Sequence, residues 1–338
     1  MHPDTDARFR LKEQDILAHA ARMFDFAPES PKKLGGFESF VYELRHPEKP
    51  RILRITDSGH RTPTQIHSEL DWVNYLAAHE APVCRPSRSV DGELVKVYRV
   101  NNDENNDEYG EYYSLVVFDK APGKIVANDE WSPALFQTWG ETIGKLHRLT
   151  VKYRPSDGIA PRRQWYDDDD LVMYKQLNRD HDIVKQRWEE LFEHLHTLSK
   201  NKAGYDLTHN DIHPGNFFVE NGRMTVFDFD DCHYDWLMND LAVALFYAVR
   251  KVGIGDGNVE FAKMFWENLL EGYNREHRLD SRWLKHVPAF LKLREFILYV
   301  ILHIEDPDSD HPWCVSFMTD RKQRIENDVP VIDMSFEL

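Results

Sequence analysis

Hydrophobic and polar positions follow two different periods in the first third of the chain. Residues 8–26 and 64–79 carry apolar side chains at the spacing of amphipathic helices, whereas residues 37–44, 52–55 and 112–118 are short β-prone runs. The apolar face of the first helix comprises Leu11, Ile16, Leu17, Ala20 and Met23. The pattern predicts a sheet accompanied by two helices.

Two further β-prone runs, residues 83–90 and 93–100, flank Asp91 and Gly92 and predict a hairpin. Beyond residue 118 the pattern is mainly helical. The predicted helices are residues 133–149, which open at the N-cap Ser132, and residues 235–251, 258–275 and 281–305. Strands therefore gather in the first part of the chain and helices in the second.

One predicted hairpin, residues 217–227, interrupts the helical part. Asn221 and Gly222 tolerate the positive φ angles of a two-residue turn. If the strands pair directly across this turn, Asn216 and Asp228 lie at the same open end. Both side chains offer oxygen atoms, which Mg²⁺ prefers as ligands. The hairpin therefore predicts a magnesium site.

Asp211 precedes this hairpin in a loop that contains Pro214 and Gly215. A carboxylate there can accept the proton of a substrate hydroxyl while Asn216 and Asp228 hold the metal on a nucleotide, which is how protein kinases divide these tasks. The spacing is typical of a phosphoryl-transfer site.

His209, Asp211 and Asn216, followed by Asp228, resemble the catalytic and metal-binding motifs of the aminoglycoside phosphotransferase and choline kinase-like family, relatives of the eukaryotic protein kinases. The loop reads HNDIHPGN, and its Asn residue stands where the family commonly has glycine. Asp230 occupies the place of the glycine in the Asp-Phe-Gly motif of protein kinases.

The resemblance implies an α+β, two-lobed protein kinase-like fold. Residues 1–118 would form a small nucleotide-binding lobe with an antiparallel sheet, and residues 119–338 a larger, mainly helical lobe for catalysis and acceptor binding. It further implies ATP and Mg²⁺ as cofactors, and transfer of the γ-phosphate to a hydroxyl of a small, amine-bearing metabolite. Neither the acceptor nor the oligomeric state follows from the sequence.

The resemblance also implies a nucleotide site in the first lobe. Gly35 and Gly36, with Ser39 beside them, let backbone N–H groups approach phosphate oxygens. Arg54 stands on the strand where the family usually has lysine, and Glu69 on the following helix is placed to pair with it.

The linker after this lobe is expected to meet the adenine edge through main-chain atoms of Val117, Phe118 and Lys120. Asp240 matches a family aspartate that supports the catalytic loop from beneath. C-terminal helices wall the acceptor pocket in the family, which makes polar residues of the last predicted helix candidates. These are Arg294, Glu295, His303, Glu305 and Asp306.

Composition narrows the choice of partners and compartment. Lys and Arg number 42 against 58 Asp and Glu, a formal net charge of −16 over 338 residues, which disfavours nucleic acid and anionic membranes. The three cysteines suggest no disulfide framework, the N-terminus does not read as a signal peptide, and no apolar run approaches the roughly 20 residues of a membrane span. We expect a cytoplasmic protein.

Three alternatives stay open at this point. His209, Asp211 and His213 would share one side of a strand and bind a transition metal in a hydrolase. Arg54 and Asp230 would suit a nucleotide-binding pseudokinase without turnover. The acceptor would be a protein if the chain belonged to the bacterial stress-response serine/threonine kinases, although the short segment after the metal motif favours a small molecule.

Overall fold

The computed structural model describes most of the chain, in two compact units. The described residues are 3–27, 29–36, 38–45, 49–100, 111–167, 169–251 and 258–336. The first unit comprises residues 1–122 and 153–161, and the second comprises residues 123–152 and 162–338. The main boundary falls four residues after the predicted one. The inclusion of residues 153–161 in the first unit was not predicted.

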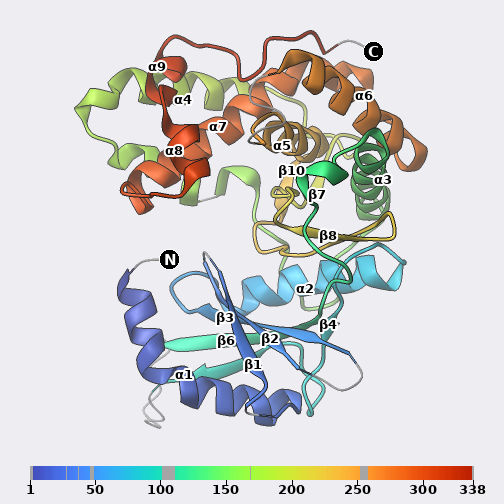
Figure 1. Ribbon diagram of the computed structural model, residues 1–338, viewed down its shortest axis with the longest axis vertical. Helices are drawn as coiled ribbons and strands as arrows, with labels where there is room; N and C mark the ends of the chain where they lie inside the picture. The colour runs from blue at the N-terminus through green and yellow to red at the C-terminus, as the bar shows by residue number, and fades with distance from the viewer. Residues whose placement is uncertain are drawn as a thin grey trace. The chain divides into compact units, whose positions relative to one another are not determined.

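The first unit consists of an antiparallel sheet and two helices (Figure 1). The helices are α1 (Pro3–Phe24) and α2 (Pro63–Ala78); the strands are β1 (Pro31–Gly35), β2 (Phe40–Leu44), β3 (Arg51–Asp57), β4 (Pro86–Ser87), β5 (Lys96–Arg99) and β6 (Tyr112–Asp119). The strand order is β1-β2-β3-β6-β4, and β5 also pairs with β6. The predicted antiparallel sheet is confirmed.

The two helices cover opposite faces of this sheet because side chains alternate along each strand. Leu53 and Ile55 of β3 pack in one apolar cluster with α1. Val116 of β6 packs with Ile66 and Leu70 of α2 on the other face. Strand residues in register with Val116 therefore point toward α2.

Two predictions for this unit are wrong, and one strand was missed. Asp91 and Gly92 do lie in a turn, but β4 and β5 occupy successive stretches of the same edge of β6 and do not pair with each other. Leu11 is 83% exposed, and the ring of Phe9 fills the space above the sheet instead, stacked on Phe40 with 3.5 Å between centroids. Strand β1 was not predicted at all.

The second unit is mainly helical and carries two small antiparallel ribbons (Figure 1). Its helices are α3 (Pro133–Thr150), α4 (Asp182–His196), α5 (Leu237–Val249), α6 (Val259–Glu276), α7 (Val287–Glu305), α8 (Pro312–Met318) and α9 (Arg321–Glu326). Strand β7 (Tyr205–Thr208) pairs with β10 (His233–Trp236), and β8 (Phe217–Glu220) pairs with β9 (Arg223–Val226). The predicted N-cap is present, since Ser132 Oγ accepts the N–H of Leu135 at 3.4 Å.

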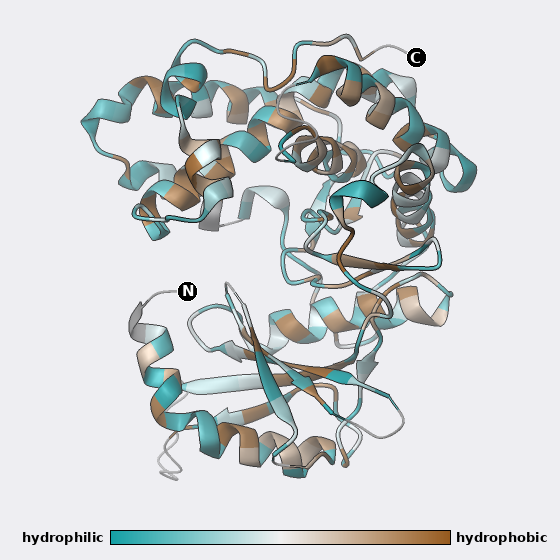
Figure 2. Cartoon of the chain, in the orientation of Figure 1, coloured by the Kyte–Doolittle hydropathy of each residue, from teal (hydrophilic) through white to brown (hydrophobic). Residues whose placement is uncertain are grey.

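Helix α5 forms the centre of this unit. All of its residues except Tyr247 are buried, and its ribbon is largely hydrophobic in Figure 2. Helices α3 and α6 cross closely beside it because glycines face the crossing: a Cβ at Gly140 would lie 1.9 Å from the carbonyl oxygen of Leu269, and one at Gly272 would lie 1.9 Å from that of Gln137. Helix α5 packs against both of these helices and against β7 and β10.

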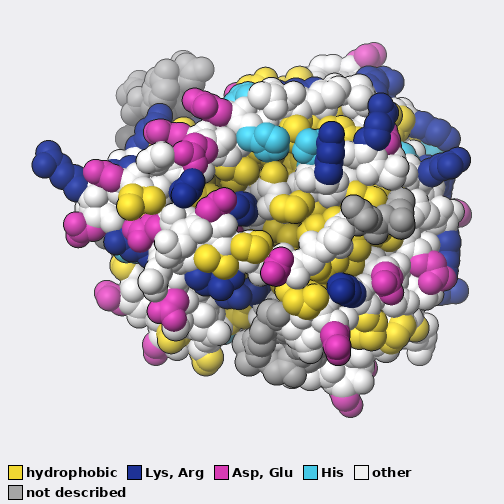
Figure 3. Space-filling view, turned by 90° about the horizontal axis from the view of Figure 1, so that it is seen from above, with side chains coloured by type: hydrophobic (Ala, Val, Ile, Leu, Met, Phe, Trp, Pro, Cys, Tyr) yellow, Lys and Arg dark blue, Asp and Glu magenta, His cyan; other side chains and the backbone are white. Residues whose placement is uncertain are grey.

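On the face shown in Figure 3, acidic and basic side chains are interspersed, and no broad basic patch appears among the described residues. None of the described helices combines the length and apolarity that a bilayer crossing requires.

Candidate active site

The loop between β7 and β8 is held from below by Asp240 in the first turn of α5. Asp240 accepts the main-chain N–H of His209 at 3.1 Å and that of Asn210 at 2.7 Å. It also bonds to His147 Nε2 at 3.0 Å, and His147 Nδ1 contacts the Tyr273 hydroxyl at 2.9 Å. The supporting position predicted for Asp240 is confirmed.

Asp211 lies at the head of this loop and has partners on both carboxylate oxygens. Oδ2 accepts hydrogen bonds from Asn216 Nδ2 at 2.8 Å and His213 Nε2 at 3.2 Å, and Oδ1 pairs with Arg294. Burial acts to raise the pKa of Asp211, but His213 and Arg294 outweigh it and hold the pKa below its usual value. Asp211 is therefore an oriented, ionised acceptor at neutral pH.

Arg294 and Tyr247 complete the setting of this carboxylate. Arg294 of α7 also donates to the Tyr247 hydroxyl at 2.6 Å, and the Tyr247 ring stacks on His213 with centroids 4.5 Å apart. Burial raises the pKa of Tyr247 to about 12, so the phenol keeps its proton. Arg294 was predicted as a candidate for the acceptor pocket because it lies in a C-terminal helix. Tyr247 was missed because its position in the sequence pattern is that of an ordinary core residue of a helix.

The hairpin has the predicted register. Glu220 pairs with Arg223 across the turn, and Asn221 and Gly222 adopt φ angles of +50° and +74°. These values are typical of the two-residue turn that matches the twist of a hairpin.

Main-chain hydrogen bonds continue beyond the paired strands at the open end of this hairpin. Phe227 donates its N–H to the carbonyl oxygen of Asn216 at 2.9 Å, and its own carbonyl accepts a bond from His209 Nε2 at 3.1 Å. Asp228 follows directly, with a φ of +65° that is uncommon outside glycine. Asn216 and Asp228 are thus brought next to each other, and Asn216 is bonded to Asp211.

The donor set at this point fits a magnesium ion. Asn216 Nδ2 gives its hydrogens to the main-chain oxygen of Asp211 at 3.0 Å and to its carboxylate at 2.8 Å. The amide oxygen of Asn216 remains as an acceptor, and Asp228, one residue beyond Phe227, supplies a carboxylate at the same end of the hairpin. A neutral and an anionic oxygen leave room for water and phosphate, as Mg²⁺ usually requires.

The alternative transition-metal site is contradicted. Residues 209–211 form a loop and not a strand. Both ring nitrogens of His209 are used in main-chain bonds, Nε2 to Phe227 and Nδ1 to the N–H of Asp211 at 3.3 Å. His213 Nδ1 accepts the N–H of Gly215 at 3.0 Å, and its Nε2 faces Asp211. The histidines organise the loop.

In the first unit, Arg54 and Glu69 form a buried bidentate ion pair. The two bonds measure 2.9 and 2.6 Å, and the side chains are 7% and 1% exposed. Arg54 reaches α2 because it lies in register with Val116, on the face opposite the α1 cluster. The predicted pairing is confirmed, while contact with a nucleotide remains a prediction.

The glycine pair lies at the end of β1. Gly35 and Gly36 adopt φ angles of +112° and +144°, and a Cβ at Gly36 would lie 1.8 Å from the carbonyl oxygen of Ser39. Ser39 Oγ is within 3.1 Å of Thr56 Oγ1. The turn requires glycine at this close approach, which suits an approach of backbone to phosphate.

Main-chain donors of the linker are largely occupied. Val117 and Phe118 pair with β3 on one side and with β4 on the other. Lys120 donates its N–H to Pro50 at 3.1 Å, and its ammonium pairs with Glu43 at 2.5 Å. Hydrogen bonds to neighbouring strands therefore engage much of the main chain that was predicted to meet the base.

A comparison with known families decides the class of the protein. The sequence model of the phosphotransferase enzyme family matches residues 32–286. The chain belongs to this family. The predicted membership is confirmed, and the hydrolase and pseudokinase alternatives are set aside. This phosphotransferase transfers the γ-phosphate of ATP, with a divalent metal ion as cofactor, to a hydroxyl group of a small molecule.

Individual relatives agree with this assignment. The phosphotransferase is 32% identical to the amicoumacin kinase of Bacillus subtilis (strain 168) over 304 residues, which span 90% of this chain and 88% of the relative. The solved structure of an amicoumacin kinase in complex with AMP-PNP, Ca²⁺ and Ami matches with a TM-score of 0.90 at 33% identity, covering 99% of each chain.

A more distant structure shares the fold alone. A microcompartment-associated aminopropanol kinase matches with a TM-score of 0.71 at 21% identity, covering 93% of this chain and 96% of that one. Together with the sheet and helices described above, these structures confirm the predicted two-lobed protein kinase-like fold.

Proposed function

We propose that this phosphotransferase acts on amicoumacin or on a closely related small molecule that carries both a hydroxyl and an amino group. The observation that carries the proposal is the similarity to amicoumacin kinases along nearly the whole chain, at a TM-score of 0.90. It is supported by the acidic composition, since a net charge of −16 suits a cationic acceptor.

The geometry of the second unit supports a role for each polar group. Asp211 accepts the hydrogen of the acceptor hydroxyl and orients its oxygen toward the γ-phosphorus. Asn216 and Asp228 hold Mg²⁺, which when bound offsets the charge of the β- and γ-phosphate oxygens. Arg294 and His213 keep Asp211 ionised and fixed in direction, so the carboxylate is already placed when the acceptor arrives.

Residues of the first unit are assigned to the nucleotide. Gly35, Gly36 and Ser39 receive the phosphates on main-chain N–H groups, and Arg54, fixed by Glu69, supplies a positive charge to them. Arginine offers a planar fork where related proteins use an ammonium, so the phosphates would meet donors fixed in one plane.

The linker is assigned to the base. Val117, Phe118 and Lys120 would contact adenine through main-chain atoms.

The proposed contact of Arg54 with the phosphates of ATP can be tested separately from its contribution to the fold. Arg54→Met alone leaves Glu69 buried without its partner, which is expected to destabilise the first unit by about 3–5 kcal/mol. The double variant with Glu69→Met restores an apolar contact but not the charge. We expect it to unfold near the wild-type temperature while the KM for ATP rises about 10- to 100-fold, the value of one or two charge-assisted hydrogen bonds. A double variant with the wild-type KM would exclude a phosphate contact by Arg54.

The acceptor is tested by a panel of hydroxyl compounds. Phosphate uptake from ATP would be measured for amicoumacin, 1-amino-2-propanol, choline, homoserine, aminoglycosides and a protein substrate, with Mg²⁺ and with EDTA. The proposal predicts the highest kcat/KM for amicoumacin and none in EDTA. A higher value for choline, homoserine, an aminoglycoside or the protein would reject it.

A further inference from the structure

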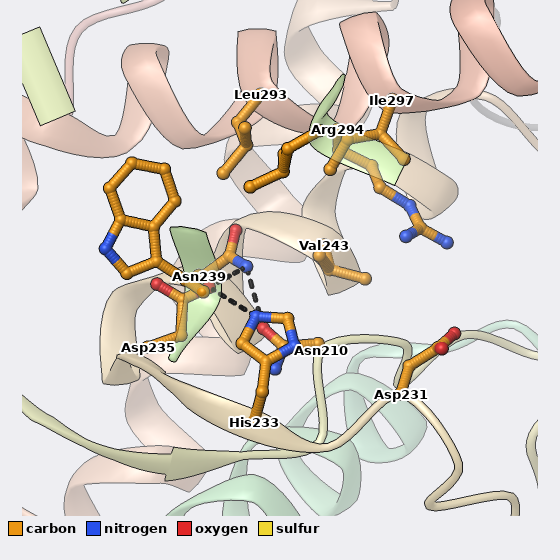
Figure 4. Close-up of a pocket in the computed structure, with 11 residues that line it drawn as sticks. Asn210, Asp231, His233, Asp235, Asn239, Val243, Leu293, Arg294 and Ile297 are labelled. Atoms are coloured by element: carbon orange, nitrogen blue, oxygen red, sulfur yellow. Dashed lines mark hydrogen bonds and ion pairs between the residues drawn. The ribbon is translucent and has the colours of Figure 1, made fainter. Parts of the chain in front are cut away.

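A pocket in the second unit adjoins the catalytic base (Figure 4). It lies between the loop that joins β7 to β8, strand β10, and helices α5 and α7. Asn210, Asn239 and Arg294 are among the residues that line it. Arg294 also pairs with Asp211. A molecule in this pocket would therefore be within one side chain of the carboxylate assigned to the acceptor hydroxyl.

Hydrogen bonds fix which atom of Asn239 faces the pocket. Its Nδ2 donates to Asn210 Oδ1 at 3.0 Å and to Asp235 Oδ2 at 2.8 Å. A carboxylate such as that of Asp235 can only accept hydrogen bonds. Asn210 donates its own Nδ2 hydrogen to the carbonyl oxygen of Thr208 at 3.4 Å, which leaves its Oδ1 as the acceptor toward Asn239. Both neighbours therefore require the donor atom of Asn239. The free atom is the oxygen.

This oxygen is buried and lacks a partner. Asn239 is 7% exposed, and its Oδ1 makes no hydrogen bond to any part of the chain that the structure describes. In Figure 4 the oxygen points away from Asn210 and His233, toward α7. A buried acceptor without a partner is costly unless a ligand supplies the donor.

The remaining lining of the pocket favours a cation on an apolar body. Asp231 and Asp235 contribute two carboxylates, the second of which faces His233 Nε2 at 3.5 Å, whereas the charge of Arg294 is offset by Asp211. The side toward the helices is apolar, through Val243, Leu293 and Ile297. A protonated amine on a short carbon chain matches both properties.

We propose that Asn239 binds the ammonium group of the acceptor and thereby selects amino alcohols whose hydroxyl reaches Asp211. Asn239 is in this sense a specificity-determining residue, held in place by Asn210 and Asp235. The inference rests on the proposed function for the identity of the reaction, but amine binding can be measured without turnover.

The test compares two alcohols, one of which carries a hydroxyl in place of the amine of the other. Dissociation constants of 1-amino-2-propanol and 1,2-propanediol would be measured by titration calorimetry with the full chain, Mg²⁺ and AMP-PNP. The wild-type protein is expected to bind the amino alcohol at least about tenfold more tightly. Equal affinities, or failure of both to bind, would overturn the inference whether or not either compound is phosphorylated.

Two variants then assign the preference to Asn239. Asn239→Leu is expected to abolish it, because leucine offers no acceptor, whereas Asn239→Gln keeps both the amide oxygen and the amide donor and is expected to retain it. Disturbance of Asn210 would weaken both alcohols alike and leave their ratio unchanged. A preserved ratio in Asn239→Leu, or a lost one in Asn239→Gln, contradicts the assignment. Phosphate transfer to amicoumacin, measured separately, reports on the proposed function.

Discussion

Replacing Asp211 with asparagine is expected to lower kcat by about 10³-fold, equivalent to about 4 kcal/mol in the barrier, with little change in the KM for ATP. An amide oxygen is a far weaker base than a carboxylate and cannot take up the hydroxyl proton. The nucleotide is assigned to Arg54 and to the metal ligands, so its affinity depends only indirectly on Asp211. Steady-state kinetics with saturating acceptor measure both quantities.

The matched control is Asp182→Asn at the exposed start of α4, which makes the same chemical change outside the site. We expect wild-type kinetics from it. Thermal unfolding of Asp211→Asn shows whether the altered pairing with Arg294 has damaged the fold. A parallel loss of ATP affinity and rate in a folded Asp211→Asn protein would contradict the assignment of Asp211 as the base.

Asp240→Asn is expected to destabilise the second unit by about 3–5 kcal/mol. Asp240 is 1% exposed and accepts two loop N–H groups and a bond from His147, and an amide cannot accept on both of its terminal atoms. Burial pushes the pKa of Asp240 up, but the bond from His147 and the charges around it outweigh burial and lower the pKa. The stabilisation is therefore present at neutral pH and is lost as the pH falls through the lowered pKa.

Tyr273→Phe is the graded control for this prediction. It removes only the hydroxyl that contacts His147, which is worth about 1 kcal/mol. Denaturant unfolding at pH 7, and in steps below the ordinary aspartate pKa of about 4, would measure both variants. If Asp240→Asn cost no more than Tyr273→Phe, the loop would not depend on this carboxylate for its conformation.

Features that depend on local chemistry were predicted from the sequence. Asn221 and Gly222 fixed the register of the hairpin, and with it the proximity of Asn216 to Asp228, because few residues tolerate those φ angles. The N-cap at Ser132 followed from its side chain in the same way.

Features that depend on distant packing were not predicted. Strand β1 reads PKKLG and has four exposed residues, so it carries no apolar alternation and is held by its ladder with β2. Tyr247 and Asn239 lie on α5 among core residues, and only the fold shows that one meets Arg294 and the other faces a pocket. Periodicity cannot separate such residues from ordinary core positions.

Binding of a divalent metal ion by Asn216 and Asp228 can be measured without turnover. Mn²⁺, which accepts the same oxygen ligands as Mg²⁺, would be titrated into the protein with AMP-PNP and its free fraction followed by electron paramagnetic resonance. We expect one tight site in the wild-type protein and in Asp182→Asn, and at least about tenfold weaker binding in Asp228→Asn. Wild-type Mn²⁺ affinity in a folded Asp228→Asn protein would show that Asn216 and Asp228 do not hold the metal.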